Sequence, residues 1–141
     1  MKKILVLTVL LVMAYGCDGG SINNRNPNIP NYPVDVQINM NLPAYSNLQF
    51  PSNHIVYFGV NAGARGIVVF NTGSNFVAFD LACPNQSFDS CSSPMTINGI
   101  EATCDCDNTV YNLFTGQSPG QPYPMKQYRV TVSGSNLYIT N

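Results

Sequence analysis

Four cysteines in the second half of the sequence are the residues best suited to chemistry. Cys104 and Cys106 form a C-x-C pair in which an aspartate follows each cysteine, and Cys83 and Cys91 precede this pair. Cysteine sulfur can form a cross-link, ligate a metal or act as a nucleophile. The chain has only one histidine, His54, so the usual partners of a catalytic or metal-bound cysteine are scarce.

The N-terminus indicates export and lipid attachment. Two lysines precede an apolar run, residues 4–13, that is too short for a permanent membrane helix, so residues 1–16 are predicted to be a secretory signal peptide. Ala14-Tyr15-Gly16-Cys17 resembles a bacterial lipobox, and Cys17 is the predicted lipidation site. Tyr15 is bulky for that motif, so an ordinary signal peptidase cut nearby is the alternative. Several acyl chains on Cys17 would anchor the protein stably in a membrane.

The charge balance excludes one class of partner. Removing residues 1–16 takes away Lys2 and Lys3, which leaves four basic and seven acidic residues and a formal charge of −3. Without a basic stripe, no nucleic acid partner is expected. Residues 17–33, which are rich in Gly, Asn and Pro, are predicted to be a lipid-anchored flexible linker ahead of a domain at residues 34–141.

The domain is predicted to be all-β. Val34, Val36, Ile38 and Met40 alternate with polar residues, as in a strand with one buried face. Further β-type runs end in turn signals, of which Asn98-Gly99 is the strongest. About eight short strands, with no convincing helical period, favour a small antiparallel sandwich or barrel. The expected runs are 34–40, 54–60, 66–70, 76–80, 95–97, 100–104, 127–132 and 136–140.

Export favours disulfide bonds among the four remaining cysteines, which allow three pairings. A bond between Cys104 and Cys106 would close a strained short ring. The two pairings between the earlier and the later cysteines both stay open on composition alone.

Two segments resemble the boxes of the Rieske [2Fe-2S] domain. They are FDLACPN at residues 79–85 and CDCDNTVYN at residues 104–112, with Cys91 between them and Thr115-Gly116 after them. Rieske proteins carry a CxH box and a CPCHGSxY box. The Cys that opens each box and the His of the same box are the cluster ligands. The resemblance covers roughly residues 60–141. It implies a Rieske-like β domain with a tip made of two loops.

The ligand positions differ from those of the family. Cys83 and Cys104 match the ligand cysteines, but Asn85 and Asp107 stand where the family has histidines. A Rieske cluster needs two histidines on one of its irons, and an amide or a carboxylate is a poor substitute for imidazole. His54 lies well before either box and is interpreted as a strand-end residue. We therefore expect no cluster at these degenerate positions and no other cofactor.

The resemblance also implies a disulfide pairing. In respiratory members a cysteine after the first box pairs with the middle cysteine of the second, which corresponds to Cys91–Cys106. Without a cluster, Cys83–Cys104 would form at the same tip. The interval between Cys83 and Cys91 is longer than in the family, so the alternative pairing, Cys83–Cys106 with Cys91–Cys104, stays open.

Other chemistry is disfavoured. The four cysteines are enough ligands for zinc, but they lack C-x-x-C knuckles, and an exported protein rarely keeps four free thiolates. Asp105 and Asp107 are too few oxygen ligands for calcium. The glycine-rich stretch 59–66 precedes a strand and not a helix, so it is interpreted as a turn and not as a phosphate site. The serines lie in loops and the chain has a single histidine, so no hydrolase is predicted.

The sequence thus predicts a lipoprotein of the bacterial cell envelope, in the outer membrane on its periplasmic or surface face. Its degenerate Rieske-like domain is expected to be a structural or binding module and not an enzyme. The predicted partners are the membrane, through the lipid, and an unknown envelope protein or glycan. The alternative is a [2Fe-2S] electron carrier with atypical ligation by Cys83 and Cys104, and Asp107 as a further candidate ligand.

Overall fold

The structure is a computed structural model that describes residue 22 and residues 24–141. The predicted signal peptide at 1–16 and the predicted lipidation site Cys17 lie outside the described residues. Among the residues that are described, no helix is long and apolar enough to cross a membrane. The strands are β1 (Asp35–Asn39), β2 (His54–Tyr57), β3 (Ile67–Asn71), β4 (Phe76–Asp80), β5 (Thr96–Asn98), β6 (Glu101–Thr103), β7 (Val110–Asn112), β8 (Gln127–Ser133) and β9 (Asn136–Thr140).

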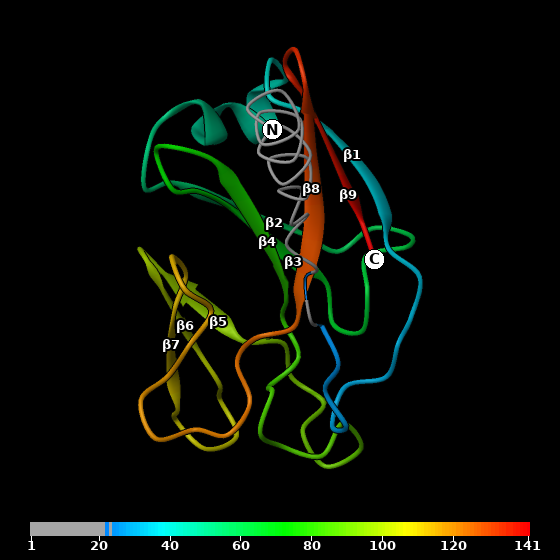
Figure 1. Cartoon of the computed structure of the whole chain (residues 1–141), viewed down its shortest axis with the longest axis vertical. Coiled ribbons are helices and arrows are strands. Elements are labelled where there is room, and N and C mark those ends of the chain that lie inside the picture. The colour runs from blue at the N-terminus through cyan, green and yellow to red at the C-terminus, as the bar shows by residue number, and fades with distance from the viewer. Residues whose placement is uncertain (1–21, 23) are drawn as a thin grey trace, which may run out of the picture.

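The strands form two antiparallel sheets, which confirms the predicted all-β class. The larger sheet has six strands in the order β1-β9-β8-β4-β3-β2, and the smaller has three in the order β5-β6-β7. In Figure 1 the smaller sheet lies below the larger one, on the side of β2, β3 and β4. The three predicted hairpins are present as β3–β4, β5–β6 and β8–β9.

Strands β3 and β4 form a wall between two hydrophobic cores. Every residue of β3 is buried, and its side chains alternate between the two faces of the sheet. Ile67 and Val69 pack into a core within the larger sheet, whereas Val68 and Phe70 pack into a second core that reaches the smaller sheet. The second core continues into the loops beyond β4, where it includes Cys83 and Cys104.

Two elements were not predicted from the sequence. The first is η1 (Pro43–Gln49), a short 3₁₀ helix that starts with proline and buries only Leu48, so it shows no apolar period. The second is β7, a strand of three residues of which only Tyr111 is buried. It pairs with β6 along the edge of the smaller sheet.

Part of the predicted linker is packed against the domain. The side-chain amides of Asn26 and Asn28 each donate a hydrogen bond to the Pro84 carbonyl at 2.9 Å, and Ile29 is only 4% exposed. The ammonium group of Lys126 donates to the Pro30 carbonyl at 3.2 Å. Residues 26–30 therefore correct the prediction of a flexible spacer that extends to residue 33. Side-chain to backbone bonds hold this segment, and composition does not reveal them.

Candidate functional site

Two loops meet at the end of β4 and form the tip that the sequence singled out. The first loop leaves β4 and returns at Met95, whose backbone N–H donates to the Leu81 carbonyl at 2.7 Å. The second connects β6 to β7. It is closed by hydrogen bonds from the Cys104 N–H to the Thr109 carbonyl at 2.9 Å and from the Asn108 N–H to the Cys104 carbonyl at 2.8 Å. Each of these bonds closes one loop on itself.

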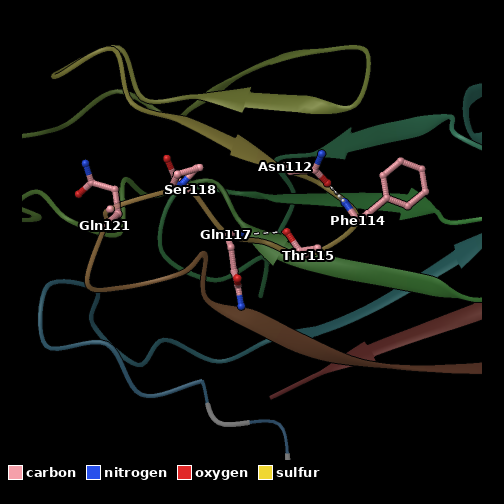
Figure 2. Close-up of a pocket in the computed structure, with 8 residues that line it drawn as sticks. Asn112, Phe114, Thr115, Gln117, Ser118 and Gln121 are labelled. Atoms are coloured by element: carbon pink, nitrogen blue, oxygen red, sulfur yellow. Dashed lines mark hydrogen bonds between the residues drawn. The ribbon is translucent and has the colours of Figure 1, made fainter.

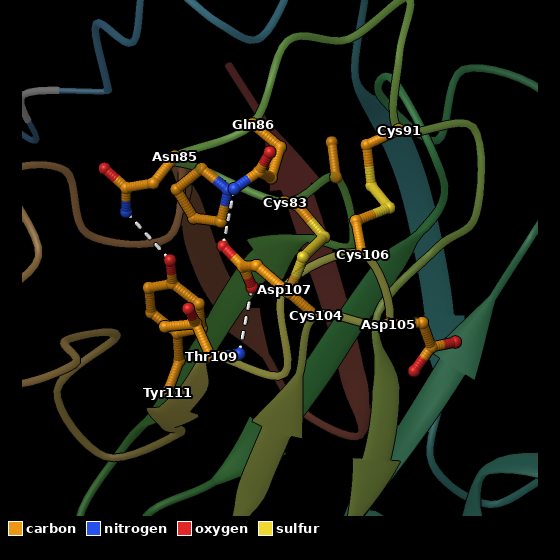
Figure 3. The surroundings of a disulfide bond; sticks show 12 residues. Cys83, Asn85, Gln86, Cys91, Cys104, Asp105, Cys106, Asp107, Thr109 and Tyr111 are labelled. Atoms are coloured by element: carbon orange, nitrogen blue, oxygen red, sulfur yellow. Dashed lines mark hydrogen bonds between the residues drawn. A yellow bond between two sulfur atoms is a disulfide. The ribbon is translucent and has the colours of Figure 1, made fainter.

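The four cysteines form two disulfide bonds that join the loops. Cys83 is bonded to Cys104, with their Cα atoms 5.5 Å apart, and Cys91 is bonded to Cys106, with their Cα atoms 6.0 Å apart. Of the two pairings left open, this is the one implied by the resemblance. Figure 3 shows the bonds side by side, and all four Sγ atoms lie within 4.8 Å of one another. Cys106 is exposed, whereas the other three cysteines are buried.

Asn85, at the first degenerate position, is used fully in hydrogen bonds. Its side-chain NH₂ donates to the Tyr111 hydroxyl and to the Tyr123 carbonyl, both at 2.8 Å. Its side-chain oxygen accepts from the Tyr123 N–H at 3.1 Å. The amide therefore connects the first loop to Tyr123, in the segment that follows β7, and to Tyr111 in β7 itself. Burial raises the pKa of Tyr111, the bond from Asn85 lowers it in part, and the charge of Asp107 adds to the rise.

Asp107, at the second degenerate position, ties the two loops to each other. One carboxylate oxygen accepts from the Gln86 side chain at 2.6 Å, and the other accepts from the Thr109 N–H at 2.9 Å. Desolvation alone would raise the pKa of Asp107, but the hydrogen bonds from Thr109 and Gln86 outweigh it, so the net shift is downward. The carboxylate form is thus the one that fits this loop.

A buried carboxylate supports the tip from behind. Asp80, at the end of β4, is fully buried. It accepts hydrogen bonds from the N–H groups of Ala64 and Ala82, at 2.7 and 2.8 Å, and from the Tyr128 hydroxyl at 2.7 Å. Burial, and then the charge of Asp80, raise the pKa of Tyr128. An acidic residue in phase with the buried face of a strand is a sequence signal that could have identified Asp80.

Arg65 supports the first loop in a similar way. Its guanidinium donates to the Phe88 carbonyl at 3.0 Å and, more weakly, to the Cys91 carbonyl at 3.5 Å. The same group lies over the Phe88 ring, 3.9 Å from its centroid, in a cation–π contact. No sequence pattern indicates this role, because Arg65 lies more than 20 residues before the residues that it contacts.

The residues at the tip do not fit a Rieske cluster. Asn85 and Asp107 make the hydrogen bonds that hold the loops, and neither supplies an imidazole nitrogen. His54 pairs with Phe70, at the end of β3 opposite to the end that faces Asp80. It therefore lies at the other end of the sheet from the cysteines. The four sulfurs are close enough together to surround one metal ion. They could serve as thiolate ligands only after both disulfides were reduced.

The two aspartates of the second loop do not share a site. Asp105 accepts a hydrogen bond from the Thr96 hydroxyl at 3.2 Å, whereas Asp107 binds Gln86 of the first loop. In Figure 3 their carboxylates point to opposite sides of the loop. This arrangement fits the expectation that they do not bind calcium together.

A pocket lies along the segment after β7. It has a volume of about 710 Å³. Figure 2 shows Gln117, Ser118 and Gln121 along this segment and Phe114 at its other end. The lining has no charged side chain and consists of Asn112, Phe114, Thr115, Gln117, Ser118, Pro119, Gly120 and Gln121.

Comparison with known proteins identifies the fold. No family model matches the chain, and no curated protein matches its sequence. Among solved structures, the quaternary ammonium Rieske monooxygenase CntA in complex with gamma-butyrobetaine is similar, with a TM-score of 0.52 and 14% identity over 77% of this chain and 32% of the other. The apo form of the same monooxygenase has a TM-score of 0.51 at 14% identity, with the same coverage of both chains.

A ferredoxin-containing structure is also similar. It is the complex of reduced oxygenase and oxidized ferredoxin in carbazole 1,9a-dioxygenase, with a TM-score of 0.47 and 19% identity over 79% of this chain and 94% of the other. At such identities the likeness concerns the fold alone. The chain has a Rieske-like fold, as the two boxes implied.

Proposed function

We propose that this Rieske-like domain carries no iron–sulfur cluster and acts as a structural or binding module of the bacterial cell envelope. The observation that carries the proposal is the use of the two degenerate positions. Asn85 and Asp107 together hold three segments of the tip through hydrogen bonds. In a Rieske domain these positions hold the irons. Here the side chains at the same positions connect segments of one chain through hydrogen bonds.

The cysteines support the same proposal. The two disulfides close chain segments with sequence separations of 21 and 15 residues. On the loop-entropy model, loops of this size contribute about 3 kcal/mol each to the free energy of unfolding. That is a large part of the stability of a small domain. Stabilisation alone is therefore a sufficient role for the cysteines in an oxidising compartment.

The test is iron analysis of the mature chain. The protein is purified from an iron-replete host, and its iron, its acid-labile sulfide and its visible absorbance are measured. We expect a colourless, folded, iron-free protein. A reduced-state electron paramagnetic resonance signal from bound iron and sulfide would contradict the proposal.

A matched variant isolates the two degenerate positions. The double substitution Asn85→His and Asp107→His restores the side chains of the family boxes and leaves all four cysteines in place. After reduction and reconstitution with iron and sulfide, we expect only the double variant to hold a cluster. Equal iron uptake by the unmodified chain would contradict the proposed role of the two substitutions.

The second candidate function is an electron carrier with atypical ligation. Its support is the proximity of the four sulfurs, all within 4.8 Å of one another. Cys83 and Cys104, with Asp107 as a further candidate ligand, would hold [2Fe-2S], and the disulfides would be absent in the loaded protein. The same iron and sulfide analysis separates this candidate from the cluster-free module.

The pocket along the segment after β7 is the proposed contact site for a partner. Its amide and hydroxyl groups both donate and accept hydrogen bonds, as sugar hydroxyls do, and Phe114 is 41% exposed at its edge. A neutral glycan of the envelope suits this lining better than a charged ligand. An envelope protein is the other proposed partner. Lipid on Cys17 would hold the domain near either of them, in the outer membrane.

A further inference from the structure

The two disulfides of the tip differ in their access to solvent. Cys106 is exposed, whereas Cys83, Cys91 and Cys104 are 4%, 4% and 0% exposed. The outer bond, Cys91–Cys106, therefore includes one exposed residue, and the inner bond, Cys83–Cys104, includes none. All four Sγ atoms nevertheless lie within 4.8 Å of one another. At that separation a thiolate released from one bond needs only a small displacement to reach the other.

We propose that the tip is a thiol–disulfide relay in which electrons from an external dithiol enter at Cys106 and reach the buried Cys83–Cys104 bond by exchange within the tip. This activity rests on the proposed function, because it needs a tip without a cluster. Its substrate is defined by chemistry alone, as a small or protein-borne dithiol. The relay adds a redox activity to a domain that is proposed above to be a structural or binding module.

The first step reduces the outer bond. A thiolate of the external dithiol attacks Sγ of Cys106, which breaks the Cys91–Cys106 bond and releases Cys91 as a thiolate. The second thiol of the dithiol then attacks the mixed disulfide and releases Cys106. Two electrons and two protons pass to the chain, and the dithiol leaves as a disulfide.

The second step moves the remaining bond outward. The Cys106 thiolate attacks Sγ of Cys83, forms Cys83–Cys106 and releases Cys104 as a thiolate, with no net change in oxidation state. Attack on Cys104 is disfavoured because a C-x-C disulfide is a strained ring. A second external dithiol then attacks the exposed Cys106 again and releases Cys83. Two dithiols are oxidised in total, and four thiols form.

The charges around the tip favour this route and restrict the reductant. The guanidinium of Arg65 donates to the Cys91 carbonyl at 3.5 Å, so a positive charge lies at the backbone of the residue whose sulfur leaves first. Asp105 and Asp107 flank Cys106 in the sequence, and both are exposed. Their negative charges disfavour the approach of an anionic thiol. The relay therefore accepts neutral or cationic thiols faster than anionic ones.

The decisive test follows the exchange itself in a variant. Cys91→Ser leaves Cys106 as a thiol beside the inner bond, so exchange needs no added reductant. After acid quenching, peptide mapping by mass spectrometry is expected to find about a tenth or more of the folded chain with Cys83–Cys106. A folded variant that contains only Cys83–Cys104 would overturn the relay.

A second measurement uses the unmodified chain and a matched control. One equivalent of dithiothreitol is added, and the species with one disulfide are mapped. We expect Cys83–Cys106 among them, and we expect the buried bond to be reduced about tenfold faster than in Cys91→Ser/Cys106→Ser. Equal rates in the two proteins, or Cys83–Cys104 as the only species, would overturn the proposal even if the single variant fails to fold.

The two proposals fail in different ways. An iron-free protein with both disulfides but without Cys83–Cys106 leaves the cluster-free module intact and removes the relay. Bound iron and sulfide in the unmodified chain would overturn both.

The charge argument is tested with cysteamine, mercaptoethanol and mercaptoethanesulfonate at equal thiolate concentration. We expect reduction rates to fall in that order, and a reversed order would overturn the assigned entry at Cys106.

Discussion

At the scale of single residues, the tip shows how metal-ligand positions can be converted into hydrogen-bonding positions. An asparagine amide offers two donors and one acceptor group, and Asn85 uses all of them on Tyr111 and Tyr123. A carboxylate only accepts, and Asp107 accepts from one group in each loop. Each side chain thus matches the polarity of the groups around it, which an imidazole would not do in the same way.

The first prediction concerns Asn85. Asn85→Ala removes the partners of the Tyr111 hydroxyl and of both backbone groups of Tyr123. Leaving such groups unpaired costs about 1–3 kcal/mol each where they are buried. We expect the free energy of unfolding to fall by about 2 kcal/mol, as measured by urea denaturation. The control is Asn47→Ala on the exposed face of η1, and an equal loss in both variants would contradict the assigned role.

The second prediction concerns pH. The pKa of Asp107 is lower in the folded protein than its ordinary value of 3.8. The stability that this carboxylate contributes is therefore complete above that value and is lost as the pH falls through the lower, folded-state pKa. In Asp107→Asn this part of the acid dependence should disappear. Urea midpoints measured between about pH 5 and pH 2 check it, and parallel curves for the two proteins would contradict it.

At the scale of elements, local signals were sufficient for the three hairpins and for β1 and β2, and insufficient for β7 and η1. Asn98-Gly99 specifies its own turn, so β5 and β6 were predictable. β7 has three residues and depends on pairing with β6, which the sequence around it does not reveal. η1 lacks an apolar period because only Leu48 is buried. The elements that were missed are short, and each buries only one residue.

The same distinction applies to the tip. The positions of the four cysteines, Asn85 and Asp107 followed from the resemblance to the two Rieske boxes, and the all-β class followed from alternation and turns. Gln86, Tyr123 and Arg65 did not follow. Each contacts a residue more than 20 positions away. A pattern read along one chain carries no information on such pairs.

The third prediction compares two glycines near the end of β7. Gly116 and Gly120 both have positive φ, at 69° and 77°. A Cβ on Gly116 would lie 2.6 Å from the Phe79 ring, whereas a Cβ on Gly120 would meet nothing within 4 Å. Both alanine variants bear a left-handed backbone penalty of about 1 kcal/mol, and Gly116→Ala adds overpacking of about 1–3 kcal/mol.

Thermal unfolding of the two glycine variants measures the difference. We expect Gly116→Ala to have a clearly lower Tm than Gly120→Ala, with Gly120→Ala closer to the unmodified chain. Because both substitutions add the same methyl group to a similar backbone conformation, the comparison isolates the contact with Phe79. Equal Tm values would contradict the predicted clash between a Cβ at position 116 and the Phe79 ring.

At the scale of the whole molecule, the fourth prediction concerns the proposed anchor. Cys17→Ser removes the acceptor sulfur for lipid and leaves the domain unchanged. We expect the unmodified protein to partition with membranes and to incorporate a labelled fatty acid, and the variant to do neither. Equal membrane association of both proteins would contradict the lipid anchor. The ordinary signal peptidase alternative predicts no label in either protein.

The strap formed by residues 26–30 has a mechanical consequence. Asn26 and Asn28 both bind the Pro84 carbonyl, next to Cys83. Among the described residues, tension along the N-terminal segment would thus be transmitted to the domain near a covalent cross-link that joins the two loops. The load would be shared between both sheets before β1 could be peeled from β9. A protein tethered at one end would in this way resist unravelling from that end.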